Sequence, residues 1–434
     1  TWELIEDYDN YDLSEEKFHE LQFNSLNKLY MNEDAVSLLK LSKIVEDPYS
    51  LGMIVAKLNI SSDDEKNMIL NNLDKKNYLI EFAKGYVYCK YNYNNAEYDC
   101  NLISNLPVVS KTNFLLMLPY NLKILKIVTN LLISDYKKYW KKVDIRFIND
   151  EKTLKYSITK LMEVHRYERV LWMYRLSMHN NKTIKYDSNI ILTCLEKIDN
   201  NFNQFDICEA IKDLQGEKNV DINRLFYIEW KFLPLLNHGD YRPITMEEII
   251  SSDANRYSEI LQLAYKEHSK SKDASNIDPN IATNAYRLLH QWKFVPGTND
   301  DGYIDSNKLK KWYGNMKNIC KEIDRLEVGL SCFGKVLFYS PKDKSGFWID
   351  KTVAEILNNN EIIRDGYKTE AFNSVGVVNW DENGTAYNKK CDEYKNRAEI
   401  TELAGYYNFA TALREISHNF EFHAEHMRDT YNDF

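Results

Sequence analysis

The chain has 434 residues, enough for two or three domains. Its hydrophobic share of 44% and charged share of 28% are typical of a folded globular protein and argue against disorder. The net charge of −9 argues against a nucleic-acid-binding or anionic-membrane-binding surface over the whole chain, although it leaves room for a local basic patch.

The cysteine pattern favours a reduced, cytoplasmic protein. The seven cysteines are scattered, none forms a Cys-x-x-Cys pair, and an odd number fits free thiols better than a disulfide framework. No signal peptide is visible, and the most apolar stretch, Phe114–Ile133, contains two lysines and Pro119. We therefore expect buried helices there and no membrane association. Because the chain begins at Thr1 without methionine, we expect it to belong to a longer protein with a covalently linked N-terminal domain.

Residues 1–150 are predicted to form an N-terminal helical region. Apolar side chains recur there at helical steps, and two strongly apolar helices are expected at Asn77–Tyr91 and Asn113–Leu132. Pro119 should interrupt the second of these helices, because proline removes a backbone hydrogen bond and clashes with the preceding turn.

A short basic stretch, Asp135–Phe147, follows these helices. Its cations surround Tyr136, Tyr139 and Trp140 and are Lys137, Lys138, Lys141, Lys142 and Arg146. A functional interpretation is nucleic-acid binding, with lysines on phosphates and Trp140 stacked on bases. The alternative is a helix with Trp140 turned inward and the lysines in solvent, which the acidic chain favours.

The segment Glu151–Met178 predicts a helical hairpin. Leu154, Ile158 and Leu161 form one apolar stripe, a polar break follows at His165–Arg169, and a second stripe begins at Val170. Neither helix can bury its stripe alone, so each hairpin needs a neighbour. We expect residues 151–270 to form an array of such hairpins.

The most apolar helix of this array is expected after Asp221, running to Pro234. We interpret it as a central helix with Trp230 in the core, and replacing Trp230 with alanine should then cost about 3–5 kcal/mol. Glu229-Trp230-Lys231 with Asp221 also has the residue types of a restriction-type nuclease centre, but the period is helical and that centre requires a strand hairpin.

Residues 281–434 are expected to form a compact, mainly helical C-terminal module, after a polar linker at His268–Asn280. The module should contain a long turn at Pro296–Asp305. A small β-hairpin is predicted at 375–387, with Asn383-Gly384 as its turn. A long helix should end the chain.

Two loop-like motifs of this module lack the context that their chemistry requires. Gly329–Val336 has the spacing of a phosphate-binding loop, but Val336 stands where a magnesium-binding Ser or Thr belongs, and a charged helix precedes the motif instead of a strand. Asp301–Asp305 resembles part of a calcium loop, but the positions of the first and last ligands hold Gly297 and Lys308. We interpret the second motif as a turn that caps the next helix.

The final helix carries the candidate catalytic residues. Arg414 and His418 lie one turn apart on one face, which a metal-independent ribonuclease could use for acid–base catalysis. Glu421, His423 and His426 lack a further ligand at recognised metal spacing, so we expect no metal and no cofactor. The alternative is a solvated polar face.

Several phrases resemble the C-terminal helical-repeat regions of large, mostly uncharacterised bacterial multidomain proteins, some of them putative antiphage defence proteins. They follow in the same order and are Tyr139–Met173, Asn223–Leu236, Ala285–Met316 and Thr411–Asp433. The resemblance implies a helical-repeat sensor or scaffold at the end of a longer polypeptide, and it supplies no active-site residues.

We therefore predict an all-α protein, a solenoid-like array of helical hairpins of a degenerate HEAT or TPR type with a compact C-terminal module. The expected function is non-enzymatic recognition or scaffolding of protein partners, in bacterial antiphage defence. Nucleic-acid binding through the basic stretch at 136–146 and ribonuclease activity through the final helix are the alternatives.

Overall fold

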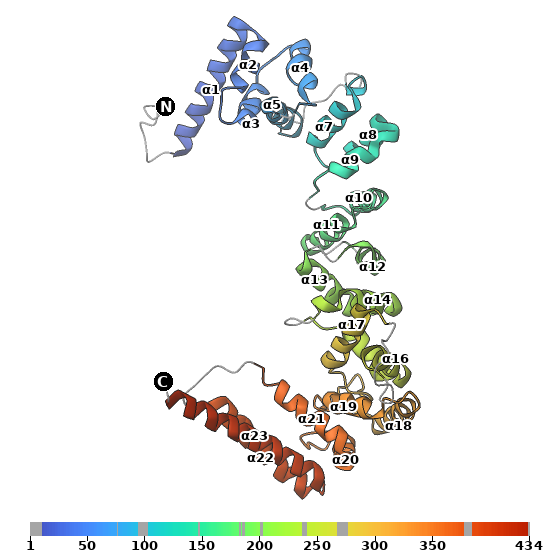
Figure 1. The fold of residues 1–434 in the computed structure, drawn as a ribbon. Helices are drawn as coiled ribbons and strands as arrows, with labels where there is room; N and C mark the ends of the chain where they lie inside the picture. Colours follow the sequence, from blue (N-terminus) through green and yellow to red (C-terminus); the bar gives the residue numbers. More distant parts are fainter. Residues whose placement is uncertain are drawn as a thin grey trace. The chain divides into compact units, whose positions relative to one another are not determined.

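The computed structural model describes residues 11–75, 77–93, 103–145, 148–181, 184, 187–199, 203–236, 241–266, 277–376 and 384–432. Within these ranges the regular structure is helical, and no strand is formed (Figure 1). The prediction of an all-α protein is thus confirmed.

The chain divides into two compact units, residues 1–198 and 199–434. This boundary falls inside the segment 151–270, for which the sequence suggested one continuous array. The helices of unit 1 are α1 (Tyr11–Glu33), α2 (Ala35–Ser42), α3 (Pro48–Val55), α4 (Ser62–Met68), α5 (Tyr78–Val87), α7 (Val108–Met117), α8 (Leu122–Leu132), α9 (Tyr136–Lys142), α10 (Glu151–Glu163), α11 (Tyr167–Asn180) and α12 (Ser188–Lys197). Those of unit 2 are α13 (Gln204–Gln215), α14 (Ile222–Phe232), α15 (Ile244–Ser252), α16 (Ala254–Ala264), α17 (Pro279–Gln291), α18 (Ser306–Glu322), α19 (Leu326–Leu337), α20 (Lys351–Asn359), α21 (Glu361–Asn373), α22 (Thr385–Leu403) and α23 (Tyr407–Asn432).

Aspartate side chains begin many of these helices. Asp150, Asp221 and Asp305 each accept a backbone hydrogen bond from the first turn of α10, α14 and α18, which satisfies donors that have no partner within the helix. The turn before Asp305 is closed by a backbone bridge between Thr298 and Ile304. The interpretation of 301–305 as a helix-capping turn is therefore correct.

The hairpin predicted at 151–178 is present as α10 and α11. Its connection turns at His165, which has a positive φ of 58°. The neighbouring Arg166 donates from Nη1 to the carbonyl oxygens of Trp140, at 2.9 Å, and Val143, at 2.7 Å. These hydrogen bonds from Arg166 connect the hairpin to the C-terminal end of α9. The predicted interruption at Pro119 is also confirmed, since α7 ends at Met117 and α8 begins at Leu122.

The core of unit 2 is built around four aromatic rings. Trp312 of α18 lies with its ring centroid 5.4 Å from Tyr257, 5.7 Å from Trp292 and 5.2 Å from Phe333. The indole Nε1 of Trp312 donates to the carbonyl oxygen of Ile250 at 3.1 Å. These rings join α15 to α19, with every polar edge paired, as stable burial of tryptophan requires.

Helices α19 and α21 cross at a pair of glycines. A Cβ added at Gly334 would lie 2.1 Å from the carbonyl oxygen of Ile363, and one added at Gly366 would lie 2.1 Å from the carbonyl oxygen of Ser331. Gly334 belongs to the sequence that resembles a phosphate-binding loop, but it lies within α19. Its role is close approach of two helix backbones.

Replacing Gly334 with alanine should lower the free energy of unfolding by about 1–3 kcal/mol, because the new methyl group would clash with the backbone of Ile363, which cannot rotate away as a side chain could. Gly314, at an exposed position within α18, is the matched control. Its Cβ would meet nothing within 4 Å, so alanine there should stabilise by about 0.5–1 kcal/mol. Urea unfolding of both variants measures the difference, and equal effects would contradict this packing.

The predicted β-hairpin at 375–387 is wrong for its second strand. Residues 385–387 form the first turn of α22, which follows Gly384 at a φ of 60°. Residues 377–383, including Asn383, lie outside the described residues. The predicted final helix is α23, which lies alongside α22 (Figure 1).

Candidate functional site

The four lysines predicted to bind nucleic acid lie on α9. Lys137, Lys138, Lys141 and Lys142 are exposed, and Lys138 forms an ion pair with Asp135 at 2.8 Å. Trp140 is fully buried, so its ring cannot stack on a base. Arg146 lies outside the described residues. Base stacking by Trp140 is therefore excluded, and phosphate binding by the lysines stays a prediction.

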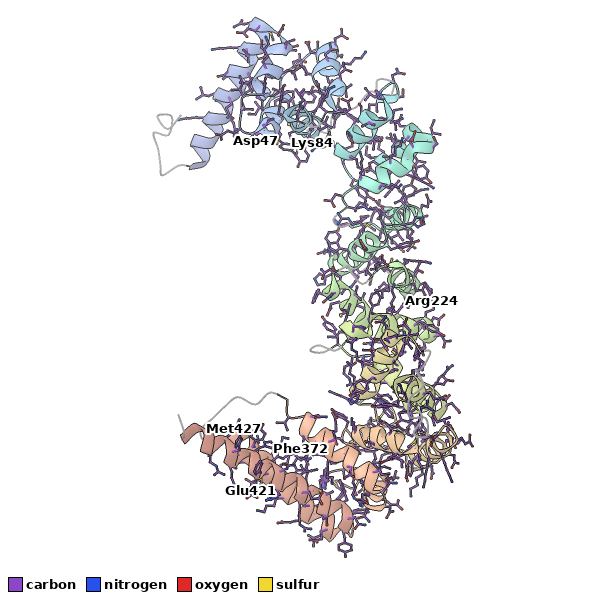
Figure 2. All side chains as sticks on the ribbon, in the orientation of Figure 1. Asp47, Lys84, Arg224, Phe372, Glu421 and Met427 are labelled. Carbon is purple, nitrogen blue, oxygen red and sulfur yellow. The ribbon has the colours of Figure 1, made fainter. Side chains whose placement is uncertain are left out.

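Arg414 and His418 lie on the exposed face of α23. The guanidinium of Arg414 pairs with Glu402 of α22, and Nδ1 of His418 lies 3.4 Å from Glu421. The side chain of His418 is 85% exposed, and Glu421 is seen on the same helix in Figure 2. Acid–base catalysis needs a pocket that holds a substrate against these groups, whereas the side chain of His418 lies open to solvent, so catalysis by this pair stays a prediction.

The neighbouring histidines stack on aromatic rings. His423 lies against Tyr387 with ring centroids 5.5 Å apart, and His426 lies parallel to Phe422 at 6.4 Å. Among the residues that the structure describes, no group of three or more potential metal-binding side chains gathers.

A cysteine and a histidine approach the same hydroxyl in unit 2. The Cys332 thiol donates to the Tyr265 hydroxyl at 3.9 Å, and His290 Nε2 lies 3.5 Å from that hydroxyl. Burial raises the pKa of the Cys332 thiol. A thiol that holds its proton is a poor nucleophile, so this cluster does not support cysteine catalysis.

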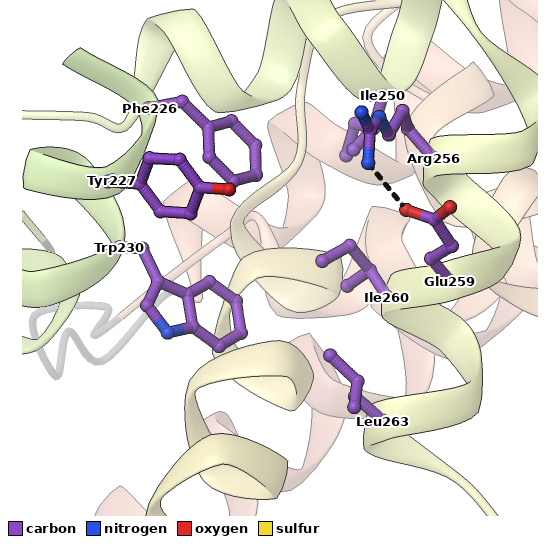
Figure 3. A pocket seen from close by; sticks show the side chains of 8 residues that line it. All are labelled: Phe226, Tyr227, Trp230, Ile250, Arg256, Glu259, Ile260 and Leu263. Carbon is purple, nitrogen blue, oxygen red and sulfur yellow. Dashed lines mark hydrogen bonds and ion pairs between the residues drawn. The ribbon is translucent and has the colours of Figure 1, made fainter. Parts of the chain in front are cut away.

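The strongest candidate site is a groove between α14 and α16 (Figure 3). Phe226, Tyr227 and Trp230 of α14 form one wall, and Ile260 and Leu263 of α16 form the other. The groove has a volume of about 190 Å³. Most of its surface is carbon, which suits the burial of apolar side chains from water.

The groove corrects the prediction that α14 is a central helix with Trp230 in the core. Leu225, Ile228 and Phe232 are buried, but Tyr227 is 70% exposed and Trp230 is partly exposed. Trp230 is therefore a groove wall that packs on the core from outside.

The two charged side chains of the groove lie at one end. Arg256 Nη1 donates to Glu259 Oε2 at 2.9 Å, and both side chains are more than half exposed, at 59% and 57%. In Figure 3 the guanidinium of Arg256 lies nearer to the aromatic wall than the Glu259 carboxylate does. An exposed pair of this kind contributes little to stability.

A buried carboxylate holds α14 in place beside the groove. Glu229 is fully buried and accepts hydrogen bonds from Gln215 Nε2 at 2.7 Å and from the backbone nitrogens of Thr245 at 3.2 Å and Met246 at 2.9 Å. Pro243 precedes the first residue of α15 and provides no side-chain cap, so Glu229 caps α15 from another helix. Burial raises the pKa of Glu229 to about 7, while the hydrogen bonds from Gln215, Met246 and Thr245 lower it.

A second buried carboxylate ties α15 to the chain that follows α17. Glu247 pairs with Arg242 and accepts a hydrogen bond from the backbone nitrogen of Lys293 at 2.9 Å. Burial raises the pKa of Glu247, and the bond with Arg242 opposes this shift. Both carboxylates thus work as links between helices.

The sequence contained a signal for Glu229 that was missed. Glu229 lies four residues after Leu225 and three before Phe232, within the apolar stripe of α14. A lone carboxylate in such a stripe must find donors inside the protein. The groove has no comparable signal in the sequence. Tyr227 and Trp230 differ from core residues only in their exposure in the fold, which their residue types do not reveal.

None of the described helices combines the length and the apolar character that crossing a membrane requires. Comparisons of the chain with models of protein families, with curated proteins and with solved structures find no match. The function must therefore be inferred from the groove and its surroundings.

Proposed function

We propose that this chain is a recognition or scaffolding module, a degenerate solenoid-like array of helical hairpins that binds a protein partner in the α14–α16 groove. Support for the array comes from helices that contact their neighbours in sequence, such as α10 with α11 and α15 with α16. Stacked helix pairs of this kind present extended surfaces for macromolecules.

The observation that carries the proposal is the aromatic wall of the groove. Tryptophan and tyrosine bring large contact areas and are enriched among the residues that dominate binding energy. Phe226, Tyr227 and Trp230 stand together, with aliphatic side chains opposite them. At about 190 Å³ the groove is smaller than the 300–1,000 Å³ typical of small-molecule sites, and its size suits a few side chains of a larger partner.

Binding through the groove should be lost when its exposed wall becomes charged. We expect Tyr227→Glu to lower the recovery of the bound protein at least tenfold in pulldowns from cells, because a carboxylate would have to be buried. The melting temperature should stay unchanged, since Tyr227 is mostly exposed.

Phe205→Glu is the matched control, because Phe205 is 62% exposed on α13 and lies outside the groove. It should leave recovery unchanged, and nuclease treatment should do the same. A partner that both variants retain, or that nuclease releases, would contradict the proposal.

A further inference from the structure

We infer that the α14–α16 groove takes an amphipathic α-helix of the partner, which inserts two apolar side chains one turn apart and sets an acidic side chain beside Arg256. This inference rests on the proposed recognition function. It adds the conformation and the charge of the bound segment.

The first argument concerns the backbone of the occupant. An extended segment exposes backbone N–H and carbonyl groups, and a polyproline segment exposes carbonyl oxygens, so both gain from polar partners along the groove. In Figure 3 the indole nitrogen of Trp230 points away from Ile260 and Leu263, and the Tyr227 hydroxyl is the polar atom of the aromatic wall. A helix satisfies its own backbone hydrogen bonds and therefore requires only the carbon surface that this groove offers.

The second argument concerns length. At a rise of 1.5 Å per residue, the wall from Phe226 to Trp230 extends about 6 Å, and the α16 side from Arg256 at the end of the groove to Leu263 extends about 10 Å. Side chains three or four residues apart on a partner helix are separated by about 5–6 Å, so two of them fit between these walls. The buried Ile250 of α15 also lines the groove.

The third argument concerns charge. Arg256 and Glu259 are the two charged side chains that line the groove, and the guanidinium lies nearer to the aromatic wall. Arginine has five N–H donors and can bind a second carboxylate while it keeps its first. A partner carboxylate is therefore the complementary group for Arg256 at the end of an apolar groove.

The test uses the full chain as bait for a displayed library of randomised peptides that includes proline-rich sequences. We expect enrichment of helix-forming peptides with two apolar residues three or four apart and an acidic residue nearby.

For a selected peptide, Arg256→Glu should weaken binding about tenfold, and changing the peptide's acidic residue to lysine should restore it. Lys311→Glu, an exposed change on α18, is the matched control and should have no effect.

Several outcomes would overturn the inference. Enrichment of proline-rich or extended peptides would reject the helix and leave the recognition function standing. Peptides that bind the Tyr227→Glu variant as tightly as the wild type would reject the groove itself, and with it the proposed function. A concentration-dependent dimer that Tyr227→Glu abolishes would replace the partner helix with a second copy of this chain.

Discussion

Replacing Trp312 with alanine is expected to lower the free energy of unfolding of unit 2 by about 3–5 kcal/mol. The indole is 5% exposed and lies among Tyr257, Trp292 and Phe333, so its removal leaves a cavity between α16 and α19. It also deprives the carbonyl oxygen of Ile250 of its donor. Urea unfolding followed by near-ultraviolet circular dichroism measures this loss.

Trp230→Ala is the informative comparison, because the sequence placed Trp230 in the core. Its side chain is partly exposed at the groove, so part of the transfer free energy of a fully buried tryptophan is absent. We expect a smaller cost than that of Trp312→Ala. Equal costs for the two variants would mean that the groove is closed in solution.

The second large effect is a pH dependence of stability that belongs to Glu229. Its pKa is about 7 in the folded chain, against an ordinary value of 4.5 in the unfolded chain. Between these values the folded chain binds the proton more tightly, so the free energy of unfolding falls as the pH rises. Protonation of Glu229 contributes about 3 kcal/mol to the free energy of unfolding. This contribution is fully present below pH 4.5 and is lost by pH 7.

Glu229→Gln removes the titrating group and nearly keeps its shape. The free energy of unfolding of the wild type, relative to that of this variant, should therefore fall by about 3 kcal/mol between pH 4.5 and pH 7. In a second variant, Gln215→Leu, Glu229 loses a hydrogen bond that lowers its pKa, so the fall should extend to higher pH. If the free energy of unfolding changed with pH in the same way for the wild type and Glu229→Gln, the Glu229 carboxyl would have the same pKa in the folded and unfolded chains, which would contradict the prediction.

The helices themselves could be predicted from the sequence, because their signals are local. The apolar period gave α10 and α11, Pro119 separated α7 from α8, and Asp305 marked the start of α18. Each of these signals acts within one or two turns of chain. Where a local signal was weak, as with Asn383-Gly384, the turn motif wrongly suggested a strand pair at a position where α22 begins.

The candidate site could not be predicted to the same extent, because it depends on which helices meet. Trp230 and Trp312 have the same side chain on amphipathic helices, and only the packing of α16 to α19 decides which one is enclosed. Glu229 acts on the start of α15, which its own sequence neighbours do not reveal. Gly334 fitted a phosphate-loop spacing, although its function depends on Ile363 in another helix.

The measurement that tests the central claim most directly is site-specific photo-crosslinking of the full chain in cells. A photoreactive residue is placed at position 227, in the groove, or at position 141, on the exposed lysine face of α9. Our account predicts a discrete protein adduct from position 227 that a selected helical peptide displaces, and none from position 141. Adducts from position 141 alone, or nucleic acid bound there, would contradict it and restore the basic stretch as the functional surface.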